Sequence, residues 1–305
     1  MSPPMATALV LLILASCSKP PETGAILESI RADDLRRHQA YLTSDELEGR
    51  QAGSPGGFKA AAYLEGECRR LGLKPAGKAG GFFYPFGDKG MKDVVAMWPG
   101  TDGNNEWIAV AAHYDHLGRN PEGEIRRGAD DNASGTSVLL EVAQAAAKRR
   151  FHRSIVFFWF DGEELGLFGS KAWMAAPTLN VSACAAMLNI DMVGRNDPRQ
   201  IIVCLEKDEA GQPKYPIWAA AIRESEEPFG VKFDWSAADN LIRRSDNWPF
   251  MERGVPAAFF TGGLHADYHT PKDTLERIDF AKEERVGRVI YSIMARCADY
   301  AGQFR

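Results

Sequence analysis

The stretch SIVFFWFDGEELG, residues 154–166, joins an uninterrupted apolar run to three acidic residues. The run, residues 154–160, is apolar without alternation, which is typical of a strand buried on both faces of a sheet. Asp161, Glu163 and Glu164 follow it, and open α/β sheets bind their ligands at that end of their strands. Alternatively, Glu163 and Glu164 open the next helix, where negative charge suits the helix dipole. The stretch predicts a central strand and leaves two roles open for its acids.

Extended and helical patterns alternate along the rest of the chain. We predict strands at residues 94–97, 107–112, 154–160, 186–193, 200–205 and 257–261. We predict helices at residues 33–47, 57–71, 134–148, 165–174, 215–223 and 280–300. This alternation favours an α/β fold, a three-layer αβα sandwich around a mostly parallel mixed sheet. Without an internal repeat or a long linker, residues 33–305 are predicted to form a single domain.

Composition narrows the class of protein. The 305 residues include 45% apolar and 25% charged residues, the balance of an ordinary soluble globular protein. The net charge is −5, and no basic stripe with interleaved aromatic residues occurs. These features argue against nucleic acid as a partner.

The first residues carry a targeting pattern. Residues 6–15 form an apolar run that suits a signal peptide and is too short to span a bilayer. The run ends in LASC, residues 14–17, which resembles the lipobox of bacterial lipoproteins, although no Lys or Arg precedes it. The resemblance implies a signal peptide at residues 1–16 and a periplasmic protein whose only membrane contact is a lipid anchor at Cys17. Residues 17–32 then read as a flexible tether.

The remaining cysteines are Cys68, Cys184, Cys204 and Cys297. Their wide spacing lacks any CxxC pair, which argues against a cysteine-based metal site. An oxidising periplasm permits disulfides. We therefore expect buried thiols with at most one bridge.

Two segments combine residue types that bind metals. His113 follows a predicted strand, and Asp115 lies two residues on, where a carboxylate can hold the imidazole from behind. GADDNASG, residues 128–135, surrounds paired acids with small residues, which suits a backbone folded tightly around a cation. The same segment can simply cap the following helix through Asn132 or Ser134. Both roles are compatible.

Two further candidates stand alone. Asp191 lies inside a predicted apolar strand, and a buried carboxylate needs a cation or hydrogen-bond donors. His269 lies in a predicted loop before the last helix. Histidine and carboxylates together are ligands typical of zinc and similar metals.

Five segments in order resemble the co-catalytic di-zinc aminopeptidases of clan MH, relatives of bacterial leucyl aminopeptidases and glutamate carboxypeptidase. They are AHYDHLG, GADDNASG, FDGEELGLFGS, NIDMVGR and YHTPKDT, and LTSDELEGR, GLKPAG and GVPAAFFTGG match as well. The resemblance covers the chain from Tyr41 to its end. It implies a phosphorylase/hydrolase-like zinc peptidase fold and an exopeptidase acting on peptides with free N-termini.

The resemblance also implies a role for each matching residue. It implies two zinc ions, with cobalt or manganese as alternatives, held by His113 and Asp191, by Glu164 and His269, and by a bridging Asp131. Glu163 would be the general base, and Asp115 would orient His113. The peptide bond between Asp131 and Asn132 is expected to be cis.

The sequence departs from the family pattern at two positions. Many relatives have Tyr and His where this chain has Arg243 and Asn247, which puts transition-state contacts and side-chain preference in question. Residues 86–94 are too few for the protease-associated insert that some relatives carry. Neither departure removes a predicted metal ligand.

Other functions on the same scaffold remain open. A glutaminyl cyclotransferase with one zinc is disfavoured by the complete set of five ligands. A carboxypeptidase would be expected to carry a dimerisation insert, and a catalytically inactive binding module to have lost ligands. The sequence leaves open the preferred N-terminal residue, peptide or protein substrates, and the oligomeric state.

Overall fold

A computed structural model describes residues 23–101, 103, 105–236 and 238–305. The predicted signal peptide, Cys17 and the first part of the tether lie outside these residues. Within them, no helix combines the length and the apolar character needed to cross a bilayer.

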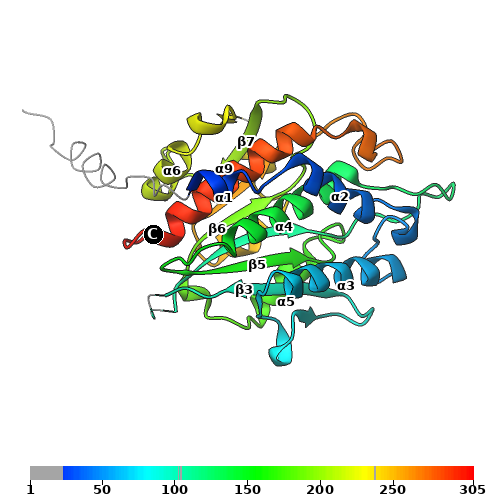
Figure 1. Ribbon diagram of the computed structural model, residues 1–305, viewed down its shortest axis with the longest axis horizontal. Coiled ribbons are helices and arrows are strands. Elements are labelled where there is room, and N and C mark those ends of the chain that lie inside the picture. Colours follow the sequence, from blue (N-terminus) through cyan, green and yellow to red (C-terminus); the bar gives the residue numbers. More distant parts are fainter. Residues whose placement is uncertain (1–22, 102, 104, 237) are drawn as a thin grey trace, which may run out of the picture.

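A nine-stranded mixed sheet forms the middle layer (Figure 1). Its order is β1-β3-β5-β4-β6-β9-β7-β8, with β2 paired to β3 at the β1 edge. The central strands β5, β4, β6 and β9 run parallel, whereas β3 and β7 flank them antiparallel. The strands are β1 Lys74–Pro75, β2 Phe83–Pro85, β3 Lys92–Trp98, β4 Trp107–His113, β5 Ser154–Phe160, β6 Cys184–Ile190, β7 Gln200–Leu205, β8 Lys232–Asp234 and β9 Ala257–Thr261. The predicted α/β architecture is confirmed.

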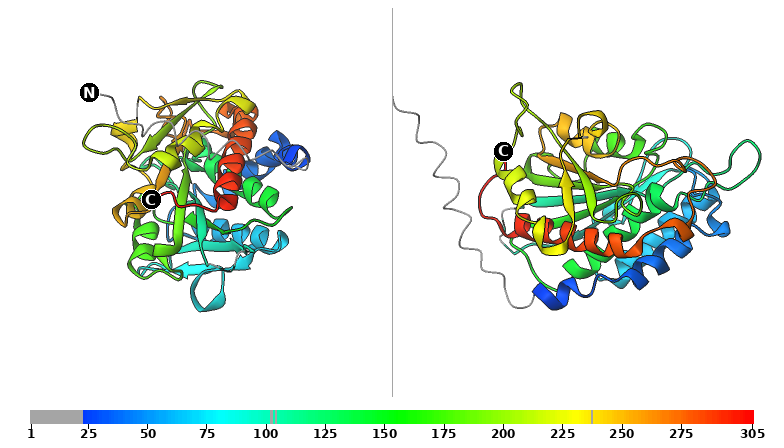
Figure 2. Two further views of the ribbon diagram at one scale, coloured as in Figure 1. Left: turned by 90° about the vertical axis from the view of Figure 1, so that its left-hand side faces the viewer. Right: turned by 90° about the horizontal axis from the view of Figure 1, so that it is seen from above.

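Helices cover both faces of the sheet, as Figures 1 and 2 show. The helices are α1 Thr23–Leu27, α2 Ala32–Leu42, α3 Pro55–Arg70, α4 Gly135–Ala146, α5 Phe168–Ala175, α6 Pro216–Arg223, α7 Ala238–Leu241, α8 Asn247–Glu252 and α9 Phe280–Asp299. One face packs against α2, α3, α4 and α9, and the other packs against α5 and α8. In β5, Phe157 belongs to the first core and Phe158 to the second, so the strand is buried on both faces as predicted.

Several predicted boundaries change in ways that matter for function. β6 ends at Ile190, so Asp191 lies one residue beyond the strand and not inside it. α5 begins at Phe168 and has no acid in its first turn, because the chain turns at Leu167 with a φ of 63°. Glu163 and Glu164 therefore do not open that helix, and the second interpretation of these acids is wrong. The short elements β1, β2, β8, α7 and α8 were not predicted.

The start of the domain also differs. Residues 23–30 of the expected tether fold onto α9, where Ile30 is fully buried against Gly287. Arg288 donates hydrogen bonds to the carbonyl oxygens of Leu27 and Ile30. These contacts tie the segment to the domain, so the ordered chain begins before residue 33.

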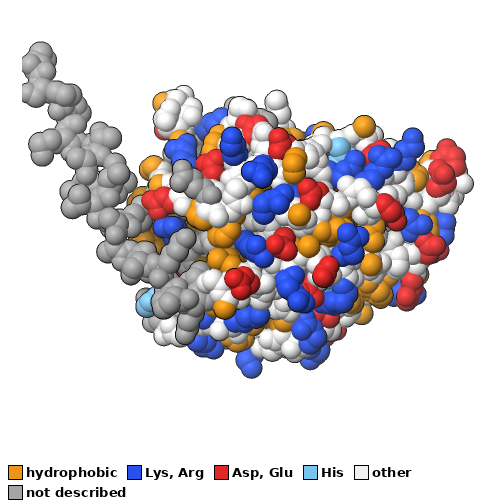
Figure 3. Space-filling view, turned by 45° about the horizontal axis from the view of Figure 1, so that its top comes forward, with side chains coloured by type: hydrophobic (Ala, Val, Ile, Leu, Met, Phe, Trp, Pro, Cys, Tyr) orange, Lys and Arg blue, Asp and Glu red, His pale blue; other side chains and the backbone are white. Residues whose placement is uncertain are grey.

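Figure 3 shows Lys and Arg side chains interspersed with Asp and Glu on one face. The cysteines Cys68, Cys184 and Cys297 are buried thiols, and Cys204 is also buried. Three of them are thiols, so no disulfide joins two of these four described residues.

Candidate metal centre

All five predicted metal ligands meet at one edge of the sheet. His113 ends β4, Glu164 lies in the turn after β5, and Asp191 directly follows β6. Asp131 belongs to the irregular turn Ala129–Ser134 before α4, and His269 lies in the loop between β9 and α9. Because β4, β5 and β6 are parallel, their carboxyl ends share one edge, where α/β sheets bind ligands.

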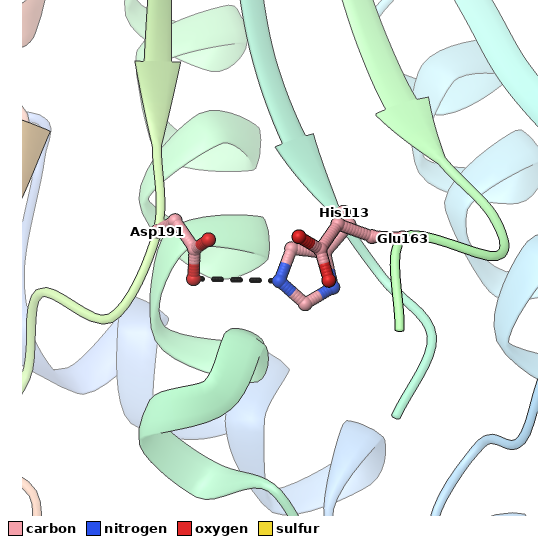
Figure 4. Close-up of side chains that lie close together, drawn as sticks. All are labelled: His113, Glu163 and Asp191. Atoms are coloured by element: carbon pink, nitrogen blue, oxygen red, sulfur yellow. Dashed lines mark ion pairs between the residues drawn. The ribbon is translucent and has the colours of Figure 1, made fainter. Parts of the chain in front are cut away.

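The first group of side chains centres on His113. Its Nε2 lies 3.3 Å from Oδ1 of Asp191 and 3.5 Å from Oδ1 of Asp131. In Figure 4 the carboxyl groups of Asp191 and Glu163 both face the His113 ring. His113 is buried, and so are the two aspartates.

The second group centres on His269. Its Nε2 lies 3.0 Å from Oδ2 of Asp131 and 3.1 Å from Oε2 of Glu164. Asp131 thus directs Oδ1 toward one histidine and Oδ2 toward the other. A carboxylate that bridges two cations needs this placement. The Asp131–Asn132 peptide bond is cis, as the resemblance implied.

The chemistry of the site fits zinc. Among the described residues, Oδ2 of Asp131, Oδ1 of Asp191 and Nε2 of His269 are buried and lack a hydrogen-bond partner. Leaving buried polar atoms unpaired is costly, and a coordinated cation removes that cost. Burial and the neighbouring Glu164 raise the pKa of Asp131, and a cation beside it would favour the ionised carboxylate. Imidazole nitrogens with carboxylate oxygens form a donor set typical of zinc.

Asp115 supports three of the predicted site residues at once. Its Oδ1 accepts a hydrogen bond from the Glu163 amide at 3.1 Å, and its Oδ2 accepts one from the Glu164 amide at 3.4 Å. Nδ1 of His113 lies 3.2 Å from the Asp115 carbonyl oxygen and 3.5 Å from its Oδ1. The expected carboxylate contact therefore exists, but the backbone oxygen is closer because the carboxylate also holds the Glu163–Glu164 turn.

Other supporting residues were not predicted. Ser245 donates a hydrogen bond to Oδ2 of Asp191 at 2.7 Å, and Asn189 donates to Ser245 at 2.8 Å. Asp273 accepts hydrogen bonds from the backbone amide of Asp131. The serine contact occupies one oxygen of Asp191 and leaves Oδ1 facing His113.

Asn132 holds the turn in front of α4. Its Oδ1 accepts hydrogen bonds from the amides of Gly135, the first residue of α4, and Met192. The capping interpretation is therefore correct for Asn132. Ser134 instead donates to the Asp130 carbonyl oxygen and has no capping contact.

His116 is a further buried residue of the site, and sequence reasoning gave it no role. Its Nδ1 lies 2.8 Å from Oε1 of Glu164 and 3.8 Å from Oδ2 of Asp131. Burial lowers the pKa of His116 to about 3, which keeps the imidazole neutral. The residue lies within AHYDHLG, but only the folded chain brings it to the acids.

A buried arginine fixes the loops that carry these residues. Arg50, from LTSDELEGR, is fully buried. Its guanidinium donates hydrogen bonds to the carbonyl oxygens of Leu42, Tyr114, Arg127 and Gly128, at 2.7, 2.9, 2.6 and 2.9 Å. It thereby joins the segment after His113 to the segment before Asp131.

A cavity of about 40 Å³ lies over the first group of side chains. Leu241, Phe259 and Leu264 give it apolar walls, while Arg244 and Tyr268 add polar groups. The Tyr268 ring stacks on His269 with centroids 3.7 Å apart. The cavity therefore offers an apolar space beside the acids.

The two departures from the family pattern lie away from the cavity lining. Arg243 packs over the Trp248 ring, with its Cζ 4.6 Å from the ring centroid. Asn247 is buried and donates a hydrogen bond to the Ile242 carbonyl oxygen at 2.6 Å. Neither replacement therefore alters the described lining of the cavity.

The chain is similar to known peptidases. The family model of peptidase family M28 matches residues 93–294. Aminopeptidase YwaD of Bacillus subtilis is 32% identical over 190 residues, covering 60% of this chain and 39% of that protein. A probable leucine aminopeptidase of Trichophyton verrucosum is 30% identical over 200 residues, covering 62% and 53%. These matches span about half the length of the curated relatives or less.

Solved structures share the fold. The LapA aminopeptidase of Legionella pneumophila superposes with a TM-score of 0.75 at 23% identity, covering 92% of this chain and 75% of that one. BSAP, a zinc aminopeptidase from Bacillus subtilis, gives 0.69 at 18% identity, covering 89% and 96%. The glutaminyl cyclase of Porphyromonas gingivalis gives 0.66 at 18% identity, covering 86% and 97%. Since the family model matches most of the chain, this protein belongs to peptidase family M28.

Proposed function

We propose that this chain is a zinc-dependent aminopeptidase that removes N-terminal residues from peptides with a two-metal site. The observation that carries the proposal is the placement of Asp131 between two histidines. Its two oxygens lie 3.5 Å from His113 Nε2 and 3.0 Å from His269 Nε2. Five ligands divided in this way suit two metals better than one.

The metals, when bound, supply an acidified water and positive charge that stabilises a developing oxyanion. Glu163 is the general base because its carboxyl group faces the cavity beside His113 and Asp191. Burial raises the pKa of Glu163, which suits a group that takes up a proton and later gives it to the leaving amine. Asp115 holds the backbone of this turn, so the carboxylate keeps its orientation.

Two features of the cavity favour an exopeptidase. The cavity is small, about 40 Å³, which suits a terminal residue rather than an extended chain. Asp131, Glu163 and Asp191 line the cavity, and their carboxylates attract the ammonium group of a free N-terminus. The apolar walls suit an aliphatic or aromatic first side chain.

Tyr268 provides a hydrogen-bond donor in the same cavity. Burial and the nearby acids raise the pKa of its phenol, so the hydroxyl stays protonated. A protonated hydroxyl can donate to the substrate carbonyl oxygen as negative charge develops there. Tyr268 can thus supply a contact of the kind lost by the replacement at position 243.

Three other functions are less well supported. A one-zinc glutaminyl cyclase shares the fold, but a single zinc does not account for the second group of ligands around His269. A carboxypeptidase would use a basic group for the substrate's terminal carboxylate. Arg244 lines the cavity, but the three carboxylates that line it as well favour an ammonium group. An inactive binding module would not require Glu163 to face the cavity.

The decisive experiment compares three substrates with metal-replete enzyme. We expect leucyl-coumarin to be hydrolysed, N-acetyl-leucyl-coumarin to be resistant, and glutaminyl-coumarin to release ammonia at no measurable rate. Activity should rise until two equivalents of zinc are bound per chain. Hydrolysis of the acetylated substrate at a similar rate would refute recognition of the free N-terminus.

We further infer that the protein is exported and held at the membrane by lipid on Cys17. The support is the apolar run of residues 6–15 followed by LASC. The first described residues, from Thr23, fold on the α9 side of the domain. The lipid anchor would be the only membrane contact.

A further inference from the structure

The loop after β4 brings a third histidine to the predicted metal site. Nδ1 of His116 lies 2.8 Å from Glu164 Oε1 and 3.8 Å from Asp131 Oδ2. Its ring lies edge-on to the His269 ring, with centroids 5.8 Å apart. His116, Asp131 and Glu164 each present one ligand atom, and these atoms lie within 4.8 Å of one another.

The spacing of these atoms is that of ligands around a single ion. Ligands about 2.1 Å from a tetrahedral zinc lie roughly 3.4 Å apart. His269 Nε2 lies 3.0 and 3.1 Å from the two carboxylates, and His116 Nδ1 lies 2.8 and 3.8 Å from the same pair. Both histidines therefore approach the same two acids at distances close to the ideal spacing.

The surrounding structure fixes the His116 ring in this position. The His116 amide donates a hydrogen bond to the carbonyl oxygen of Arg50, whose guanidinium holds the neighbouring loops. Gly128 adopts a φ of 56°, and a Cβ there would lie 2.5 Å from Cγ of His116. The chain thus keeps a glycine where any side chain would displace the imidazole.

A lesser role for His116 must be weighed. Nδ1 could carry a proton and donate it to Glu164, which would orient that carboxylate without contacting a metal. Nε2 of His116 has no hydrogen-bond partner among the described residues, so the polar contacts of the ring are those of Nδ1, and packing and the backbone hold the rest. The approach to Asp131 as well as Glu164 favours direct ligation, because orienting Glu164 requires only one of these contacts.

We propose that His116 is a fourth protein ligand of the metal held by Asp131, Glu164 and His269. This inference rests on the proposed two-metal function. It makes the two metal positions unequal, since the ligands assigned to the His113 position are His113, Asp131 and Asp191, while Glu163 beside them is assigned as the general base. Zinc sites with four protein ligands are closed, whereas catalytic positions keep a place for water or substrate. The His116 position should hold the resident metal, and the His113 position the exchangeable one.

The first test measures zinc affinity by equilibrium dialysis against zinc buffers, with zinc counted by mass spectrometry. Loss of an outer partner typically costs about 10–100-fold in affinity, so loss of a ligand should exceed about 100-fold at one of the two positions. We therefore expect His116→Gln to lower the zinc affinity of the tighter position by more than about 100-fold. His265→Gln is the matched control, because the His265 side chain is 4% exposed and lies beside Asp130, outside the proposed ligand set. It should change zinc affinity by less than about 10-fold.

The second test counts ligands, and its deciding measurement uses the wild-type protein. X-ray absorption of the wild-type protein loaded with two cobalt ions should show three imidazoles per two metals, and His116→Gln should show two. Two imidazoles in the wild type, with two metals bound, would overturn the proposal and leave His116 as a positioning residue. Failure of the wild type to bind two metals would instead overturn the proposed two-metal function.

Discussion

Arg50 offers a quantitative test of how the site is held together. Replacing it with Met keeps much of the side-chain volume but leaves four buried carbonyl oxygens without their donor. Each buried acceptor left unsatisfied costs about 1–3 kcal/mol. Part of this loss is offset, because burying the guanidinium is itself costly, and burial lowers the pKa of Arg50 to about 10. Met avoids that cost, so the net loss should fall in the lower part of the about 4–12 kcal/mol that four such acceptors imply.

We therefore expect Arg50→Met to lower the free energy of unfolding by about 4–6 kcal/mol, the size seen when a buried network is broken. Denaturation by urea of the metal-stripped protein measures this loss without a contribution from zinc binding. Arg69→Met is the control, since Arg69 is exposed, pairs with Glu65 at the surface and otherwise lies over the Phe82 ring. Its loss should stay within about 1 kcal/mol.

The same variant has a second expected effect. Arg50 joins the carbonyl oxygens of Tyr114 and Gly128, so its removal should loosen the loops that carry His116 and Asp131. Zinc affinity of the folded variant should fall with stability. A metal-stripped Arg50→Met protein within 1 kcal/mol of the wild type would refute the assignment of Arg50 as the tie between these loops.

Three further predictions concern the site and the lipid anchor. Glu163→Gln should keep near-normal zinc content and lose at least ~10²-fold in turnover, whereas Glu164→Gln should lose zinc. Intact turnover in Glu163→Gln would remove Glu163 from the mechanism. Ser245→Ala should lower zinc affinity by about 10–100-fold, because the hydroxyl orients Asp191, and dialysis against zinc buffers measures the change. Cys17→Ser should move the protein from the membrane to the soluble periplasmic fraction, and equal partitioning of both forms would contradict the lipid anchor.

The sequence predicted the elements that carry a strong local pattern. The apolar runs of β5, β7 and β9 have the predicted bounds, because burial on both faces leaves an unbroken apolar signal. The strands β1 and β8 have two and three residues, too few for any periodicity to appear. Asp191 was placed inside β6 since apolar residues continue past it, although the strand ends at Ile190.

The site residues could be predicted only where the sequence motifs resemble those of a known family. The resemblance named the ligands that the structure brings together, but it gave no role to Arg50 or His116. A charged residue such as Arg50 is ordinarily a surface residue, and no local pattern signals its burial. The contacts of His116 with Glu164 and Asp131 join positions far apart in the chain, and they arise only when the strands align.

The walls of the cavity come partly from a segment that supplies none of the predicted metal ligands. Leu241 and Arg244 lie between β8 and α8, whereas the ligands leave β4, β5, β6 and their neighbouring loops. Exchange of residues 238–244 between relatives would therefore alter which first residue is accepted while leaving hydrolysis intact. Selectivity in this protein can diversify, in evolution or by engineering, without rebuilding the reactive centre.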